Sequence, residues 1–271
     1  MKGKKSTILL ILIFVIGLSL LLYPSVSNYW NSFRESRALA GYVGAVAHLD
    51  EKEYQAILSE ARGYNETLLD MTNRFSVIEE RSHERYMKAL SVNEDGIMGY
   101  VAVKKLGISL PIYHTTDDSV LQHGIGHLEG SSLPVGGTGT HCVISGHRGL
   151  PSAKLFSDLD RLEVGDTFVL NVLEETMTYE VDQIRIVLPE DTEELAIDPM
   201  KDYCTLFTCT PYGINSHRML VRGHRVENEA DLLRIRADAL KVDTVIVAAF
   251  LAIPLLLIAL AIMLFQPQKK K

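Results

Sequence analysis

The sequence predicts a mainly β domain, built as a closed or nearly closed barrel, with helices before it and a membrane-spanning segment on each side. Short runs rich in β-branched and aromatic residues follow one another from Met98 to Gly223, with turn signals between them. Residues 31–91 carry apolar positions at helical spacing. Both ends of the chain contain long apolar stretches.

The first apolar stretch, residues 7–23, is predicted to be an N-terminal transmembrane anchor. It is nearly all Ile, Leu, Val and Phe, although its length is near the lower limit for a span. Its lysine-rich flank, residues 1–6, also fits the n-region of a signal peptide. The tract from Tyr23 to Ser27 is a poor cleavage site, which favours an uncleaved anchor.

The second apolar stretch, residues 242–265, is predicted to be a C-terminal transmembrane helix. It is uncharged apart from Asp243 and long enough to cross a hydrocarbon core of about 30 Å. Pro254 inside it is tolerated because kinked helices are common in membranes. A basic tail, residues 266–271, follows. Because lysines flank both spans, we expect both termini in the cytoplasm and the domain between them on the outside of the cell membrane.

The charge balance argues against a nucleic-acid partner. The chain has 27 basic and 34 acidic residues and a formal net charge of −7. Six of the lysines lie in the two termini, so the rest of the chain has a more negative net charge than the chain as a whole. An acidic exterior repels phosphate backbones.

Helices are expected between the first span and the barrel. Residues 31–91 form a predicted helical lead-in of two or three helices, rich in Glu, Arg, Ala and Leu, which we interpret as a stalk or packing layer. The barrel domain occupies residues 98–226, and the charged residues 227–241 then form a short helix or linker. The expected strands are at 99–103, 108–113, 142–145, 167–172, 178–181 with 184–187, 203–208 and 218–223.

Cys209 has the best setting for a nucleophile among the three cysteines. A reactive cysteine needs a stabilised thiolate. Cys209 stands where a β run gives way to a loop containing Pro211 and Gly213. The strand beyond that loop is rich in groups that favour a thiolate, namely His217, Arg218, Arg222, His224 and Arg225.

Cys142 and Cys204 lie inside β runs and are interpreted as buried core residues. An odd number of cysteines in an oxidising compartment leaves at least one thiol free. Cys204 and Cys209 do not have C-x-x-C spacing, so we expect neither a disulfide framework nor a zinc ribbon.

His147 is the candidate proton-transfer partner, because it lies where a strand runs into a loop containing Gly149 and Pro151. His123 and His127 have the spacing of two metal ligands on a helix, but the two glycines between them argue against a helix. No third ligand is evident, so no metal and no cofactor is expected.

The segment from Thr205 to Arg225, TLFTCTPYGINSHRMLVRGHR, resembles the T-L-x-T-C signature of sortases. Its longer form resembles the class C, pilus-assembling branch. The segments 126–134 and 146–156 are similar to the same branch, as is the layout of two spans around one domain. The resemblance covers nearly the whole chain and implies an eight-stranded β-barrel.

The resemblance also implies the site residues. A cysteine, a histidine and an arginine converge near one end of the sortase barrel, and the motifs match these to Cys209, His147 and Arg218. His217 then takes a packing or hydrogen-bonding role, since neighbouring side chains of a strand point to opposite faces. No Asp or Asn stands out as an orienting partner of His147.

The activity implied is that of a cysteine transpeptidase on a Gram-positive cell surface, acting on LPXTG-like sorting signals. Cys209 attacks the carbonyl after the Thr, His147 protonates the leaving amine of the Gly, and Arg218 stabilises the oxyanion. An amine then resolves the thioester. The favoured partners are LPXTG-bearing pilin subunits and their acceptor lysines, whose joining polymerises a pilus.

Two alternatives remain. One is a housekeeping-type sortase that joins proteins to a cell-wall precursor, and the other is a catalytically silent surface binding module. Many class C enzymes also carry an N-terminal lid with an Asp-Pro-aromatic plug. No such tripeptide precedes the barrel, and the nearest match, Asp198-Pro199-Met200, lies just upstream of the cysteine strand. We therefore expect an open groove, with no N-terminal side chain in it.

Overall fold

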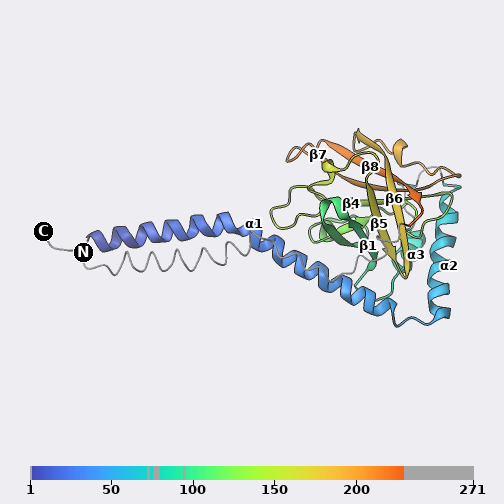
Figure 1. The fold of residues 1–271 in the computed structure, drawn as a ribbon, viewed down its shortest axis with the longest axis horizontal. Coiled ribbons are helices and arrows are strands. Elements are labelled where there is room, and N and C mark those ends of the chain that lie inside the picture. The colour runs from blue at the N-terminus through green and yellow to red at the C-terminus, as the bar shows by residue number, and fades with distance from the viewer. Residues whose placement is uncertain (1, 72–73, 76–79, 94, 229–271) are drawn as a thin grey trace.

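The computed structural model describes residues 2–71, 74–75, 80–93 and 95–228. The predicted second span at 242–265, the tail at 266–271 and most of the predicted linker lie outside the described residues. Figure 1 shows a long N-terminal helix that leads into a domain built around a β-barrel.

The N-terminal helix, α1 (Lys2–Val46), is continuous through Pro24. The sequence had indicated a span ending near residue 23 and a separate helical region from residue 31. A proline removes one backbone donor but need not end a helix, and no glycine interrupts the chain between Pro24 and Gly41. Among the described residues, α1 is the one helix long and apolar enough to cross a membrane, and its most apolar window is not buried in the domain.

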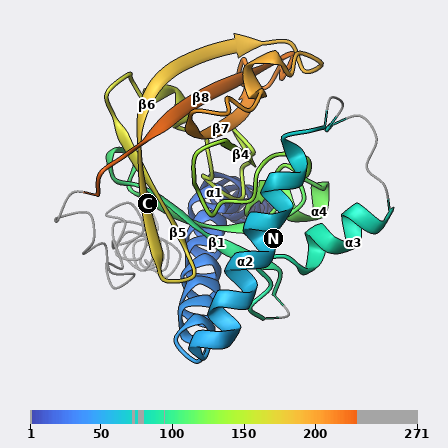
Figure 2. The same ribbon diagram turned by 90° about the vertical axis from the view of Figure 1, so that its right-hand side faces the viewer.

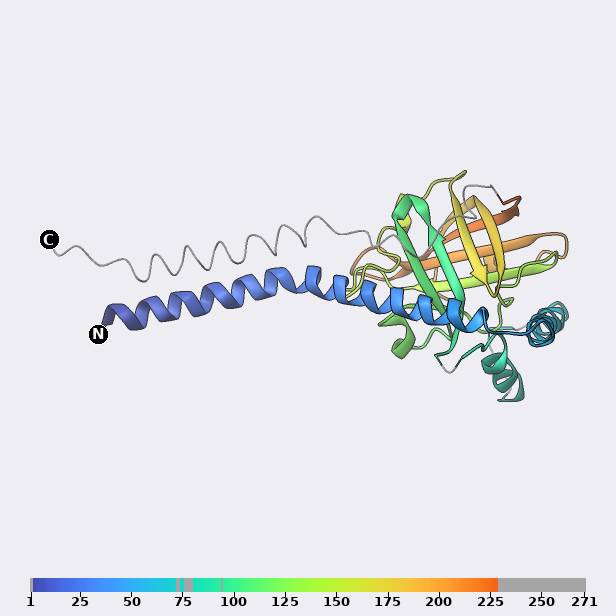
Figure 3. The same cartoon turned by 60° about the horizontal axis from the view of Figure 1, so that its bottom comes forward.

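The C-terminal part of α1 packs on the barrel (Figures 1 and 3). Tyr42 is fully buried there. Its hydroxyl donates to the Met98 carbonyl at 3.0 Å and accepts from the Leu173 amide at 2.7 Å. This part of the helix is therefore fixed to the barrel by both packing and buried hydrogen bonds.

A second contact lies closer to the apolar part of α1. Asn31 Nδ2 donates to the Ser152 carbonyl at 2.6 Å, and Asn28 Oδ1 accepts from the Lys154 amide at 2.9 Å. Ser152 and Lys154 belong to the loop that follows the strand ending at Gly146. The helix is thereby attached to the loop that carries His147.

Two further helices lie on the α1 side of the barrel, as Figure 2 shows. Helix α2 (Glu51–Leu68) begins with a capping box in which Asp50 and Glu53 satisfy each other's backbone amides. Helix α3 (Glu80–Lys88) places the buried Tyr86 against the barrel. A short helix, α4 (Asp118–Leu121), and three 3₁₀ turns, η1 (Lys104–Leu106), η2 (Leu159–Arg161) and η3 (Glu193–Leu195), lie between strands.

The strands form a closed eight-stranded barrel, which confirms the predicted mainly β architecture. Their order is β1-β2-β3-β4-β7-β8-β6-β5, and β5 pairs with β1 to close the barrel. The pairs β2–β3 and β4–β7 are parallel. The strands are β1 (Ile97–Val103), β2 (Ile108–His114), β3 (Ile125–His127), β4 (Thr140–Gly146), β5 (Thr167–Val172), β6 (Glu175–Val187), β7 (Asp202–Thr210) and β8 (His217–Val226).

Strand β3 was not among the expected strands, because three residues are too few to show an alternation. Its central Gly126 allows a close approach of two backbones: a Cβ atom there would lie 2.0 Å from the Thr115 carbonyl oxygen. The two runs expected at 178–181 and 184–187 are one strand, β6, whose pairing with β8 is interrupted by a bulge between Val181 and Gln183.

The sheet formed by β4, β7 and β8 has a buried core on each face. The inner face contributes to the main core of the barrel, for example through Ile144, Leu206 and Val221. The outer face contributes Val143 and Leu220 to a smaller core, which Leu195 of the β6–β7 connection covers. Alternate residues of each strand therefore pack in two different cores.

Candidate active site

The three predicted site residues lie at one end of the β4–β7–β8 sheet. Cys209 is near the end of β7 and pairs directly with Arg218 near the start of β8. His147 follows β4 immediately. The parallel β4–β7 ladder ends where Ser145 lies opposite Phe207, so His147 and Cys209 each lie two residues beyond the last pair. Cys209 and Arg218 thus form one row across β7 and β8, His147 leaves the sheet at the same end, and all three side chains are half-buried.

Side-chain alternation puts Cys209 on the outer face of the sheet. Leu206 and Thr208 point to the interior, whereas Phe207 packs in the outer core, so Cys209 points outward as Phe207 does. On β8, Leu220 packs in the outer core and Arg218 shares its face. The row that contains Cys209 is therefore next to the row formed by Phe207 and Leu220.

A buried hydrogen bond fixes the strand ends that carry His147 and Cys209. Thr208 Oγ1 donates to the Gly146 carbonyl at 2.7 Å, and Thr208 is 1% exposed. The donor precedes Cys209 and the acceptor precedes His147, so this bond sets the spacing of the two backbones where the side chains leave them.

The loop after His147 is held against the β7–β8 loop. Gly149 has a φ of +79°, and a Cβ atom there would lie 2.5 Å from the ring of Tyr212. Glycine is required both for the conformation and for this contact. The Gly149 amide also donates to Ser157 Oγ at 3.0 Å, and an ion pair joins Arg148 to Asp160. The two loops that flank the row are therefore packed together.

The Arg218 guanidinium is directed by the β7–β8 loop. Its Nη1 donates to the carbonyls of Asn215 and His217, each at 3.2 Å. His217 lies on the opposite face of β8 and is close to Ser216 Oγ, at 2.9 Å from Nδ1. The arginine, and not the adjacent histidine, shares a face with Cys209.

A groove lies beside this row on the outer face. It is a cavity of about 390 Å³ whose wall includes the Arg218 side chain. Most of its apolar lining comes from the outer core, and Glu190, Asp191 and Thr192 of the β6–β7 connection form a polar part of its wall. The apolar side chains that line it are Phe75, Leu128, Val187, Pro189, Leu195, Phe207 and Leu220.

The sequence predicted that no N-terminal side chain would reach the groove, but Phe75 lines it. Arg74 Nη2 donates to the Leu195 carbonyl at 3.2 Å, and the Arg74 guanidinium lies 5.1 Å from the centre of the Phe75 ring. A Cβ atom at Gly130 would lie 2.2 Å from the Arg74 carbonyl oxygen. The pair Arg74–Phe75 therefore covers the outer core without an Asp-Pro-aromatic tripeptide.

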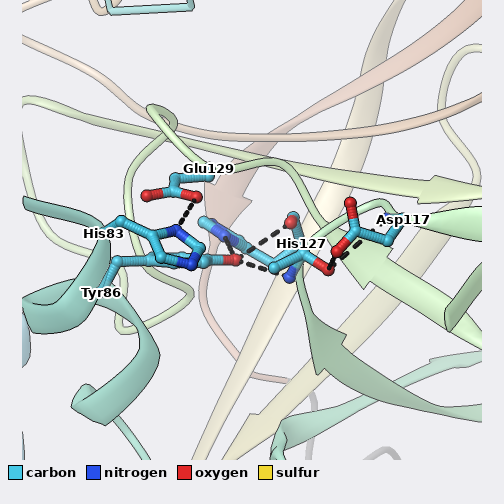
Figure 4. Close-up of polar contacts among 6 residues, drawn as sticks. His83, Tyr86, Asp117, His127 and Glu129 are labelled. Atoms are coloured by element: carbon cyan, nitrogen blue, oxygen red, sulfur yellow. Dashed lines mark hydrogen bonds and ion pairs between the residues drawn. The ribbon is translucent and has the colours of Figure 1, made fainter. Parts of the chain in front are cut away.

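A polar network holds α3, the helix that follows Phe75 in the sequence (Figure 4). His83 Nδ1 lies 2.8 Å from Glu129 Oε2, and the Tyr86 hydroxyl lies 3.1 Å from His127 Nδ1. The same hydroxyl accepts from the Thr115 amide at 2.9 Å. These residues were not predicted as partners, because no spacing in the sequence connects α3 with β3.

The remaining candidates from the sequence have other surroundings. Cys142 and Cys204 are buried in the main core. His127 is buried, and its Nε2 lies 2.9 Å from the Ser132 carbonyl oxygen, while His123 Nδ1 lies 3.1 Å from the Ser119 carbonyl oxygen. Within the described part of the chain, no group of three or more His, Cys, Asp or Glu side chains is placed to hold a metal ion.

Comparison with known proteins identifies the family. Residues 101–226 match the sortase domain. The crystal structure of sortase C1 from Streptococcus agalactiae is 50% identical and has a TM-score of 0.68, over 71% of this chain and 100% of that one. A sortase C of Streptococcus pneumoniae, whose structure is described in terms of catalysis and pilin substrate specificity, is 40% identical with a TM-score of 0.61, over 71% and 97% of the two chains.

A more distant relative, Sortase D of Bacillus subtilis (strain 168), is 31% identical over 131 residues, which are 47% of this chain and 63% of that protein. This chain thus spans less than two thirds of that relative, but the whole of the S. agalactiae sortase C1 structure. With the sortase domain in the barrel and half of the compared residues identical to those of a class C enzyme, the chain belongs to the sortase family.

Proposed function

We propose that this sortase is a membrane-anchored cysteine transpeptidase that cleaves LPXTG-like sorting signals between Thr and Gly and joins the acyl group to a pilin lysine. The observation that supports the proposal is the direct pairing of Cys209 with Arg218, beside an apolar groove and at the end of the sheet where His147 follows β4. The similarity to sortase C enzymes supports the pilin as substrate.

Each of these three residues has a distinct role in the proposed reaction. The Cys209 thiolate attacks the Thr carbonyl carbon, and the carbonyl oxygen becomes an oxyanion. Arg218 donates to that oxyanion, which suits arginine because it stays charged at any working pH. His147 gives its proton to the leaving Gly nitrogen, and a thioester remains on Cys209. The lysine amine then attacks the thioester, and its surplus proton returns to His147.

The groove fits an extended apolar peptide. Phe207 and Leu220 lie one row away from Cys209 and Arg218 on the same face. A peptide whose scissile carbonyl sits at Cys209 would lay its preceding residues over this row. The Leu and Pro of the sorting signal are apolar, as is most of the lining.

The proposal also places the enzyme at a membrane. The N-terminal part of α1 crosses the bilayer, and residues 242–265 supply a second span that lies outside the described residues. The flanking lysines put both termini in the cytoplasm and the barrel outside. Protease added to protoplasts should then remove a barrel epitope, and protection of that epitope would contradict this topology.

The test uses the full chain in detergent, with an LPXTG peptide and a lysine-bearing pilin domain. We expect an acyl-enzyme on Cys209 and an isopeptide product, both detected by mass spectrometry. A product formed only with a cell-wall precursor amine would instead support wall anchoring. Absence of any acyl-enzyme in the wild type would reject catalysis altogether. His217→Ala is the matched control, because this histidine neighbours Arg218 but faces away from the row.

A further inference from the structure

The two cysteines that the proposed reaction does not use face each other inside the barrel. The parallel β4–β7 register places Cys142 directly opposite Cys204. Both side chains belong to the main core and are 3% and 0% exposed. Both are free thiols in the structure. Neighbouring strands lie about 4.7–4.9 Å apart, which is within the range of about 4.4–6.8 Å between the Cα atoms of a disulfide.

Cys209 is excluded from pairing with either of them. It is five positions from Cys204 on the same strand, so the two side chains point to opposite faces of the sheet. Cys209 belongs to the half-buried row on the outer face, and Cys142 and Cys204 lie within the barrel. The fold therefore allows one disulfide among the three cysteines.

We infer that Cys142 and Cys204 form a disulfide that bridges β4 and β7 when the chain folds in the presence of a low-molecular-weight disulfide. One cysteine thiolate attacks a sulfur of the oxidant and releases one small thiol. The second cysteine attacks the mixed disulfide and releases the other small thiol. The protein loses two protons and two electrons, and the oxidant takes up both to become two thiols.

Burial acts on both thiols of the folded protein. It raises the pKa of the Cys204 thiol well above its ordinary value. Burial acts in the same direction on Cys142, but the neighbouring Cys204 and His127 oppose it and lower the pKa of Cys142.

The bridge has a consequence for the outer face. It leaves Cys209 as the single free thiol of the chain, so the nucleophile has no competing partner within the protein. It also joins β7, which carries Cys209, to β4, which ends just before His147. A cross-link that closes a long loop restricts the unfolded chain, so the oxidised protein should be the more stable one.

The experiment counts thiols in the full chain. One sample is folded with oxidised glutathione and a second with a reductant, and each is denatured and alkylated with iodoacetamide. We expect one alkylated cysteine, Cys209, in the oxidised sample and three in the reduced sample. Peptide mapping should recover a linked pair that contains Cys142 and Cys204. Three alkylated cysteines in the oxidised sample, or a disulfide that includes Cys209, would overturn the inference.

Thermal unfolding gives an independent measure. Oxidised wild type should melt at a temperature about 5 °C or more above reduced wild type. The double variant Cys142→Val and Cys204→Val keeps apolar side chains of similar size and should melt at the same temperature in both conditions. Equal melting temperatures for the two wild-type samples would contradict the bridge even if the variant does not fold.

Discussion

The two faces of the β4–β7–β8 sheet differ in what covers them. The inner face is enclosed by the barrel itself, through strands that cannot separate without unfolding. The outer face is covered by single segments, namely Phe75 and the β6–β7 connection with Leu195. The same strands thus carry an enclosed core on one side and, on the other, a groove that short segments cover.

The largest effect should separate the two faces on one strand. Cys209→Ala removes the proposed nucleophile and should abolish acyl-enzyme and product, while the melting temperature stays close to that of the wild type. Leu206→Ala, on the inner face, should lower the free energy of unfolding by about 2–5 kcal/mol and still allow acylation of the folded fraction. Product from Cys209→Ala in a mass-spectrometric assay would refute the assignment.

Arg218→Ala should reduce kcat by about 10²–10³, which is the usual effect of losing one oxyanion donor. The matched variant His217→Ala changes the neighbouring residue on the opposite face and should retain kcat within about threefold. Steady-state kinetics with the same peptide compare the two. A larger loss in His217→Ala than in Arg218→Ala would show that the assignment of faces on β8 is wrong.

A pH effect on stability should arise from His141, which lies under the covering segments of the outer face. Burial lowers its pKa to about 4, opposed by a hydrogen bond to the Ala196 carbonyl. The unfolded imidazole takes up a proton near pH 6.5. Above about pH 6.5 the imidazole is neutral in both the folded and the unfolded protein, and the free energy of unfolding is at its full value. As the pH falls towards 4, the unfolded imidazole gains a proton that the buried one does not, so the free energy of unfolding decreases.

The expected loss is about 3 kcal/mol in the free energy of unfolding, measured by urea denaturation across that pH range. His141→Gln removes the titrating group and should flatten this part of the pH dependence. Other groups titrate in the same range, so the difference between the two proteins is the relevant quantity. An identical slope in both would exclude His141 as its source.

The covering segment itself should have a smaller effect. Phe75→Ala should raise the rate at which a methanethiosulfonate reagent modifies Cys209 by up to about tenfold, because a larger fraction of molecules then has an open groove. Met71→Ala is the control, since this exposed residue belongs to the same segment but does not line the groove. Equal rates in wild type and Phe75→Ala would mean that the groove is open, as the sequence indicated.

The sequence was sufficient for what depends on local pattern and on the family motif. It predicted the barrel from its alternating runs. It also predicted that Cys209, His147 and Arg218 lie where a strand meets a loop, which is where each lies in the structure, while their catalytic roles stay predictions. It did not predict β3, whose three residues show no periodicity, or the continuity of α1 through Pro24. Phe75 was missed because its place depends on contacts with Gly130 and Leu195, far away in the chain.

If α1 spans the membrane as proposed, the contacts of Asn28 and Asn31 with the loop after His147 set the distance between the lipid and the proposed active site. With a rise of 1.5 Å per residue, Asn31 lies about 14 Å along α1 from Leu22, the end of the apolar run. With α1 in the bilayer as proposed, the helix holds the proposed active site at a fixed distance from the membrane surface. A sorting signal held in the membrane by its own span can then be cleaved only if its scissile bond stands at about that height. One additional helical turn below Asn28 would lift the site by about 5.4 Å and take it out of reach of the same substrate.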